Sequence, residues 1–183
     1  MTSPELFILD ATAFIGLEFP LLMDSKAFPN AVFFTTFSVA SELKDFRSRM
    51  NLESLKQSGL LQLNIPQTEI LLDITKKIQE IDPHSPLSSV DMDILALALE
   101  LGGTLISNDF TIQNAAYYLK IPIKTLNGKK IENLRIWQLK CKGCGKKIET
   151  YVQACPHCGG QMIKRQFVNI EQNLKKENNI KNS

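Results

Sequence analysis

All four cysteines of the chain fall within eighteen residues, and their spacing constrains what this part of the chain can fold into. The pattern is Cys-x2-Cys, ten residues, Cys-x2-Cys, formed by Cys141, Cys144, Cys155 and Cys158. A glycine follows each pair and lets the backbone turn tightly, so that its amides face the two thiolates. We therefore predict a structural zinc ribbon whose four thiolates complete a tetrahedral shell. A redox dithiol or two disulfides are alternatives that the doubled spacing disfavours. His157, inside the second turn, is expected to face solvent.

Apolar residues in the first 125 positions alternate between short continuous runs and segments of helical periodicity. The runs predict strands over residues 7–9, 31–35, 61–65, 104–107 and 121–126, and the periodic segments predict helices over 11–19, 38–50, 52–57, 69–81, 90–101 and 110–119. The most apolar of these helices, 90–101, ends at two glycines, a typical C-terminal stop. Strands that alternate with helices favour a parallel sheet flanked by helices, so the predicted fold class is α/β.

Charge is distributed unevenly, although the net charge is only +2. Residues 1–125 carry nine Lys and Arg against fifteen Asp and Glu, whereas residues 126–183 carry twelve against four. Such asymmetry suggests an acidic working part attached to a part that binds a polyanion such as nucleic acid, and two ordinary solvated surfaces are the alternative. We predict a first domain over 1–126, a linker over 127–137, the zinc ribbon over 138–166 and a flexible tail over 167–183.

The chain shows no sign of membrane insertion or export. Its most apolar stretch, 94–106, is shorter than a membrane span and contains Glu100. The N-terminus lacks the basic region of a signal peptide. We therefore expect a cytoplasmic protein, in a reducing compartment that favours zinc-bound cysteines over disulfides.

Two acids directly follow predicted strands, Asp10 after 7–9 and Asp109 after 104–107. Open parallel sheets bind their ligands beyond the carboxyl ends of the strands, so both acids are expected at that edge. A helix begins after each acid, so an ordinary N-cap is the alternative for either one.

Two further acids are predicted to lie against the apolar core. Glu42 shares a helical face with Val39, Leu43 and Phe46, and Asp91 lies near the start of the most apolar helix. Carboxylates in such places are rare unless they are paired or bind a metal.

The four acids come from separated segments and are expected to converge on one pocket, where their mutual repulsion would require divalent cations. The alternative is four unrelated acids at helix ends. Asp93 falls on the same side of its helix as Glu100, so we expect it to be solvated or to support the site from outside.

Residues 6–126 resemble a PIN-domain ribonuclease. The resemblance rests on four short segments in the right order: Leu9-Asp10-Ala11-Thr12-Ala13-Phe14-Ile15, Ser41-Glu42-Leu43, Leu87-Ser88-Ser89-Val90-Asp91-Met92-Asp93-Ile94-Leu95-Ala96-Leu97-Ala98, and Ser107-Asn108-Asp109-Phe110. The order of a PIN domain, a tryptophan (Trp137) and a zinc ribbon is similar to the archaeal NOB-type endonucleases, which mature the 3′ end of small-subunit ribosomal RNA. The Gln113-Asn114 pair adds to the match, and Asn108 departs from it where many relatives carry an acid.

The resemblance implies a catalytic set of Asp10, Glu42, Asp91 and Asp109 that holds one or two Mg²⁺ or Mn²⁺ ions and hydrolyses precursor 16S rRNA on the nascent small ribosomal subunit. Thr12 and Ser107 are expected either to orient metal-bound waters or only to make local hydrogen bonds. The chain has two histidines, too few to favour cleavage through the ribose 2′-hydroxyl by paired imidazoles. A PIN nuclease for messenger or transfer RNA, and a non-catalytic RNA-binding assembly factor, are the alternatives. PIN domains often form dimers, so a homodimer is a further possibility that the resemblance implies.

Overall fold

The computed structural model of the chain describes residues 3–82, 85–126, 128, 130–131, 135–148 and 152–169, with the backbone alone at 81, 135–138 and 163–169. The chain divides into two compact units, Met1–Thr75 with Pro86–Ile131, and Lys76–Ser85 with Glu132–Ser183. Among the described residues, no helix is both long and apolar enough to cross a membrane.

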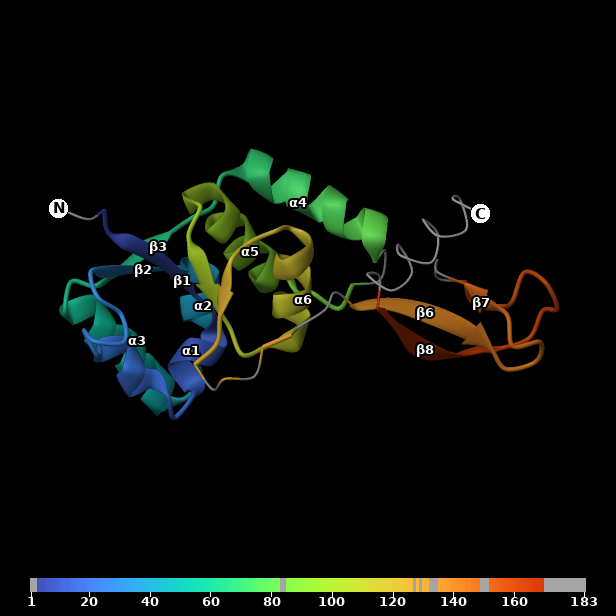
Figure 1. Cartoon of the computed structure of the whole chain (residues 1–183), viewed down its shortest axis with the longest axis horizontal. Coiled ribbons are helices and arrows are strands. Elements are labelled where there is room, and N and C mark those ends of the chain that lie inside the picture. The colour runs from blue at the N-terminus through green and yellow to red at the C-terminus, as the bar shows by residue number, and fades with distance from the viewer. Residues whose placement is uncertain are drawn as a thin grey trace, which may run out of the picture. The chain divides into compact units, whose positions relative to one another are not determined.

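The first unit is built on a five-stranded parallel sheet, which confirms the predicted fold class (Figure 1). Its strands, in the spatial order β3-β2-β1-β4-β5, are Leu61–Asn64, Ala31–Thr36, Glu5–Leu9, Thr104–Ile106 and Ile123–Lys124. The central strand β1 therefore has β2 on one side and β4 on the other. Consequently the carboxyl ends of β2, β1 and β4 lie next to one another.

Helices cover this sheet and supply most of the remaining core. They are α1 (Ala11–Ile15), the 3-10 helix η1 (Phe19–Met23), α2 (Phe37–Glu42), α3 (Phe46–Gln57), α4 (Thr68–Ile81), α5 (Ser89–Leu101) and α6 (Phe110–Tyr118). Helix α5 packs against β1, β2 and β4, and its residues from Ile94 to Ala98 are all buried. A helix that is apolar on every side belongs in a protein interior, so the apolar pattern of this segment matches its place.

Gly103 allows β4 to lie close to β1. A Cβ atom at this position would lie 2.4 Å from Ile8 Cδ1 and 2.8 Å from the carbonyl oxygen of Leu6. The preceding Gly102 ends α5 in the left-handed conformation, with φ of 62°. The predicted glycine stop is therefore confirmed, and the second glycine fits the strand that follows.

The helix predicted over 38–50 is instead two helices, α2 and α3. The Asp45 carboxylate accepts a hydrogen bond from the Ser48 amide at 2.9 Å and so starts a new helix soon after α2 ends at Glu42. The predicted apolar face shared by Glu42 and Phe46 is therefore wrong. Both of these side chains are exposed, whereas Val39 and Leu43 are buried. The helix predicted over 11–19 is also shorter, because α1 ends at Ile15.

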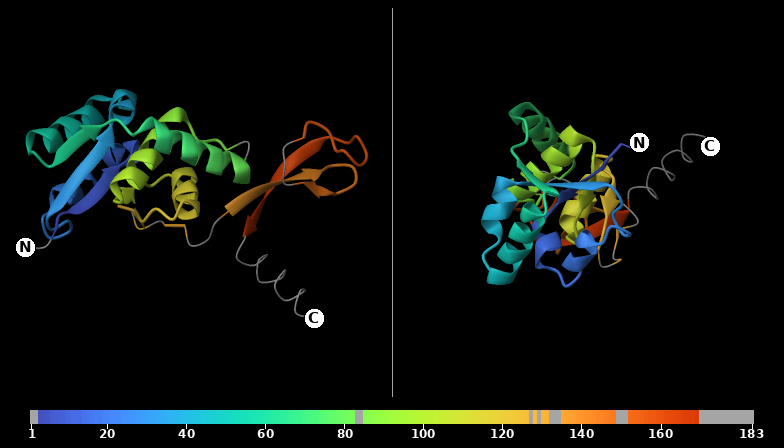
Figure 2. Two further views of the ribbon diagram at one scale, coloured as in Figure 1. Left: turned by 90° about the horizontal axis from the view of Figure 1, so that it is seen from above. Right: turned by 90° about the vertical axis from the view of Figure 1, so that its left-hand side faces the viewer.

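The second unit contains an antiparallel three-stranded sheet in the order β7-β6-β8, seen as the orange and red arrows of Figure 2. The strands are β6 (Arg135–Cys141), β7 (Lys147–Ile148) and β8 (Met162–Asn169). Strand β6 begins within the segment predicted as linker, and β8 runs three residues beyond 166. The predicted domain limits stay predictions, and residues 170–183 of the predicted tail lie outside the described residues.

Candidate active site and zinc centre

Asp10 and Asp109 lie at neighbouring strand ends, although 99 positions separate them in the chain. In the parallel pairing of β1 with β4, Leu9 is opposite Ile106, so Asp10 is the next residue on one strand and Ser107 on the other. Each acid is also the N-cap of the helix that follows. Each acid therefore lies at the carboxyl edge of the sheet and also caps the next helix, although the sequence presented these two roles as alternatives.

Hydrogen bonds gather around the Asp10 carboxylate, which is buried at 4 % exposure. Its Oδ2 atom accepts hydrogen bonds from the Ser107 hydroxyl at 2.8 Å and the Thr12 hydroxyl at 2.9 Å. The Ser107 hydroxyl in turn accepts the Asp109 amide at 3.0 Å. Ser107 therefore ties Asp10 to the backbone of Asp109.

Burial raises the pKa of Asp10 above its ordinary value, against the lowering effect of the hydrogen bonds from Ser107 and Thr12. The negative charge of Asp91 raises this pKa further. Asp91 is therefore close enough to Asp10 for the two carboxylates to repel each other. A bound cation would relieve both the burial cost and the repulsion.

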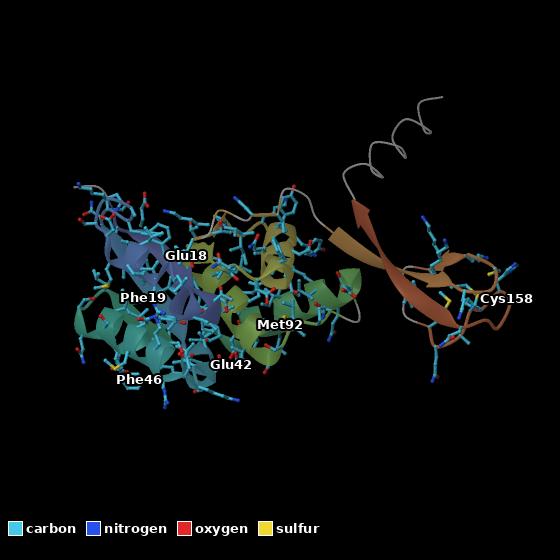
Figure 3. All side chains as sticks on the ribbon, turned by 90° about the horizontal axis from the view of Figure 1, so that it is seen from below. Glu18, Phe19, Glu42, Phe46, Met92 and Cys158 are labelled. Atoms are coloured by element: carbon cyan, nitrogen blue, oxygen red, sulfur yellow. The ribbon has the colours of Figure 1, made fainter. Side chains whose placement is uncertain are left out.

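The other predicted acids occupy more open positions. Asp91 is half-buried in the first turn of α5, where its carboxylate accepts the Ser88 amide at 2.7 Å in a capping box. Asp109 is exposed and accepts the Thr111 amide at 2.6 Å. Glu42 is the exposed last residue of α2, a helix that packs against α5 and β2 (Figure 3).

The four carboxylates are not gathered at the spacing of ligands around one ion. In the described part of the chain, only the four cysteines form a group of three or more metal-binding side chains close enough to share an ion. The structure brings Asp10 and Asp91 within electrostatic range and joins Asp10 to Asp109 through Ser107.

Asp93 makes a contact that sequence reasoning did not find. Its carboxylate accepts the Ser38 hydroxyl at 2.7 Å, and Ser38 shares a hydrogen bond of 2.9 Å with the buried Thr36 at the end of β2. This chain joins α5 to the start of α2, the helix that ends in Glu42. Its only signal in the sequence is the pair of hydroxyl residues, Thr36 and Ser38, around the point where β2 ends and α2 begins.

Gln113, from the motif segment that follows Asp109, supports the site from within the core. Its side-chain amide donates to the Ser107 carbonyl at 3.1 Å and accepts the Ile131 amide at 2.9 Å. Asn108 donates its backbone amide to the Thr12 hydroxyl at 2.9 Å, so its backbone helps to orient Thr12. These contacts fix the backbone around Ser107.

The four cysteines of the second unit form a compact cluster. Their sulfur atoms all lie within 4.8 Å of one another, with 3.5 Å between Cys141 and Cys158 and 3.6 Å between Cys144 and Cys155. All four thiols are free, which excludes the two-disulfide alternative in this structure. A Cβ atom on Gly160 would lie 3.0 Å from the Cys141 sulfur, so the backbone fits closely around the cluster.

Backbone amides favour thiolates in this cluster. The amide of Cys144 lowers the pKa of Cys141 to about 6, and the amide of His157 lowers the pKa of Cys155. The amide of Lys146 acts in the same direction on Cys144, but its neighbour Cys158, with burial, raises that pKa to about 11. Four adjacent thiolates are thus favoured only with a cation among them, and sulfur ligands in a tetrahedral set suit Zn²⁺. The side chain of His157 is exposed, as predicted.

Comparisons with known proteins give a consistent relationship. A family model described as the PIN domain of ribonuclease matches residues 7–101. Endoribonuclease Nob1 of Pyrococcus abyssi is 34% identical over 148 residues, which cover 78% of this chain and 91% of that protein. The 20S-pre-rRNA D-site endonuclease NOB1 of Saccharomyces cerevisiae is 33% identical over 106 residues, or 58% of this chain and 22% of that protein. The VapBC-1 structure from nontypeable Haemophilus influenzae shares the fold, with a TM-score of 0.50, 16% identity, and coverage of 67% of this chain and 98% of that one.

Proposed function

Because the chain belongs to the Nob1 family of PIN-domain ribonucleases, we propose that it is a metal-dependent endoribonuclease of ribosome biogenesis. The observation that carries this proposal is the linkage of Asp10 to Asp109 through Ser107 at adjacent strand ends, with Asp91 close enough to raise the pKa of Asp10. Acids at the carboxyl edge of a parallel sheet are placed where such sheets bind ligands.

Asp10, Glu42, Asp91 and Asp109 would hold the catalytic cation, with Mg²⁺ or Mn²⁺ as the ions suited to carboxylate oxygens. When bound, the cation would activate water and neutralise charge on the scissile phosphate. The roles of the chain's own residues are simpler. Ser107 and Thr12 stabilise the ionised form of Asp10, and Gln113 fixes the backbone of Ser107. Hydrolysis by water would leave a 5′-phosphate and a 3′-hydroxyl.

The proposed substrate is precursor small-subunit rRNA near its 3′ end, in the cytoplasm, on the nascent subunit. This is supported by the name of the yeast relative, a pre-rRNA endonuclease. It is also supported by the positive charge of residues 126–183, which would attract the phosphate backbone that an acidic site repels. The cysteine cluster would bind Zn²⁺ as a structural ion of that basic unit.

The test is cleavage of a short RNA that spans the 3′ end of small-subunit rRNA, with and without Mn²⁺. We expect Mn²⁺-dependent cutting by the wild type and its loss in Asp10→Asn, with RNA binding retained. Asp24→Asn, an exposed acid outside the site, serves as the matched control and should cut normally. Binding without cutting by the wild type would indicate a non-catalytic assembly factor, and cutting only of messenger or transfer RNA would indicate a different PIN nuclease.

A further inference from the structure

The outward side of α3 carries a group of residues that the proposed catalytic site does not use. They are Phe46, Arg47, Arg49 and Met50, called here the α3 face. Ser48, Leu52 and Leu55 are buried and mark the side of the helix that packs on the domain. At 100° per residue, Phe46 and Met50 point away from that side and the two arginines flank them.

The arginines of the α3 face are exposed and form no ion pair with the described residues. The ion pair of the described residues is Lys56 with Glu53 at 3.6 Å, which does not involve Arg47 or Arg49. These two are also the only arginines among residues 1–125, where acids outnumber bases by fifteen to nine. Exposed, unpaired arginines in an acidic domain point to an anionic partner.

The apolar side chains of the α3 face are exposed to solvent. Phe46 is 76 % exposed and Met50 is 52 % exposed, and they lie one helical turn apart. An aromatic ring beside guanidinium groups matches the chemistry of unpaired RNA, whose bases stack on aromatic rings and whose phosphates bind arginine. A purely apolar protein partner would leave both arginines without a counter-charge.

The α3 face lies close to the proposed site. Phe46 follows Glu42 by four residues, so their Cα atoms are at most about 14 Å apart. Figure 3 labels Glu42 and Phe46 along the same edge of the domain. RNA held on this face would therefore continue toward the acid at the end of α2.

We propose that the α3 face binds the single-stranded RNA that flanks the cleavage point, with Phe46 stacking on a base and Arg47 and Arg49 contacting phosphates. This rests on the proposed function for its substrate. It also places sequence-independent contacts on the acidic first unit, whereas charge alone assigns RNA binding to the basic second unit.

The experiment measures binding of a fluorescent single-stranded RNA by anisotropy over a series of salt concentrations, in the Asp10→Asn background so that binding is read independently of cleavage. The test variant carries Arg47→Gln and Arg49→Gln. The matched control carries Lys26→Gln and Lys120→Gln, which remove the same charge from exposed positions outside α3. Circular dichroism checks that both variants fold.

We expect the arginine variant to bind about 25-fold more weakly at 0.1 M salt, with a salt slope smaller by about 1.4, because each phosphate contact to a single strand contributes about 0.7. The control should leave the slope unchanged. Phe46→Ala should weaken binding roughly 5- to 150-fold at an unchanged slope, the range for loss of one stacked base. Phe46→Trp should bind RNA as tightly as the unchanged Phe46, and RNA should quench the fluorescence of the introduced indole ring.

Equal slopes in the arginine variant and the control would overturn the proposal and leave the α3 face to a protein partner. The outcome is separable from that of the proposed function. If the wild type fails to cut RNA but the arginine variant and the control show the expected salt slopes, the nuclease assignment is refuted. The α3 face would then still be an RNA-binding surface.

Discussion

Replacing Ser107 by alanine tests the hydrogen-bonded centre of the site most sharply. The Ser107 hydroxyl is fully buried, donates to the Asp10 carboxylate and accepts the Asp109 amide. Ser107→Ala removes both hydrogen bonds and very little volume. A hydrogen bond to a charged group contributes about 1.5–3 kcal/mol. The Asp109 amide lies beside an exposed side chain and regains water, so its loss adds about 1 kcal/mol or less. We expect a loss of about 2–4 kcal/mol in the free energy of unfolding at pH 7.

The pH dependence separates the charged hydrogen bond from any other effect. Burial raises the pKa of folded Asp10 and the Ser107 hydrogen bond opposes that rise, so the charged hydrogen bond contributes only above this raised folded pKa and is lost as pH falls through it. The loss caused by Ser107→Ala should therefore grow as pH rises through the folded pKa of Asp10 and should be only about 1 kcal/mol near pH 3.

Thr35→Val provides the matched control. The Thr35 hydroxyl is equally buried and donates to the neutral carbonyl of Leu9 at 2.8 Å. Its removal should cost the same at both pH values. The measurement is urea unfolding of wild type and both variants at pH 3 and pH 7, without divalent ions. If Ser107→Ala costs the same at the two pH values, as Thr35→Val should, then Ser107 does not stabilise an ionised Asp10 and the reasoning fails.

Three further predictions concern other parts of the molecule. Asp93→Ala removes the carboxylate that accepts the Ser38 hydroxyl and should lower the unfolding free energy by about 1–2 kcal/mol in urea melts. Ser38→Ala should lower it by about as much, and the double variant should lose no more than either single variant. Additive losses would show that the two side chains are uncoupled. Removal of Zn²⁺ with a chelator should unfold the second unit and reduce the β-sheet signal in circular dichroism while the helical signal of the first unit is kept, and a spectrum unchanged by the chelator would contradict a structural metal. Gly160→Ala places a methyl group 3.0 Å from the Cys141 sulfur and should weaken Zn²⁺ retention in a chelator competition, while Gly143→Ala, with 3.6 Å to its nearest sulfur, should retain the ion.

The sheet and its edge could be predicted from the sequence because each depends on local patterns. Continuous apolar runs identify β1, β2 and β4 as buried strands, and an acid directly after a strand must lie at its carboxyl end. The cysteine cluster was predictable for the same reason, since the ligand spacing and glycines are local.

Glu42 shows where this approach ends. Helical periodicity placed it against the core, but the Asp45 cap starts α3 and leaves Glu42 exposed at the end of α2. A capping residue sets a helix boundary within a single turn, whereas hydrophobic periodicity is read over several turns and does not detect such a boundary. The contact of Asp93 with Ser38 was missed for another reason, because it joins residues 55 positions apart and depends on the packing of α2 against α5.

The most direct measurement is a titration with Mn²⁺, followed by the electron paramagnetic resonance signal of the free ion, on protein whose zinc site is already filled. The wild type should bind Mn²⁺ saturably, and affinity should fall at least tenfold in each of four single variants: Asp10→Asn, Glu42→Gln, Asp91→Asn and Asp109→Asn. Asp24→Asn should bind like the wild type. Identical Mn²⁺ binding in the wild type and all four variants would show that these carboxylates share no ion.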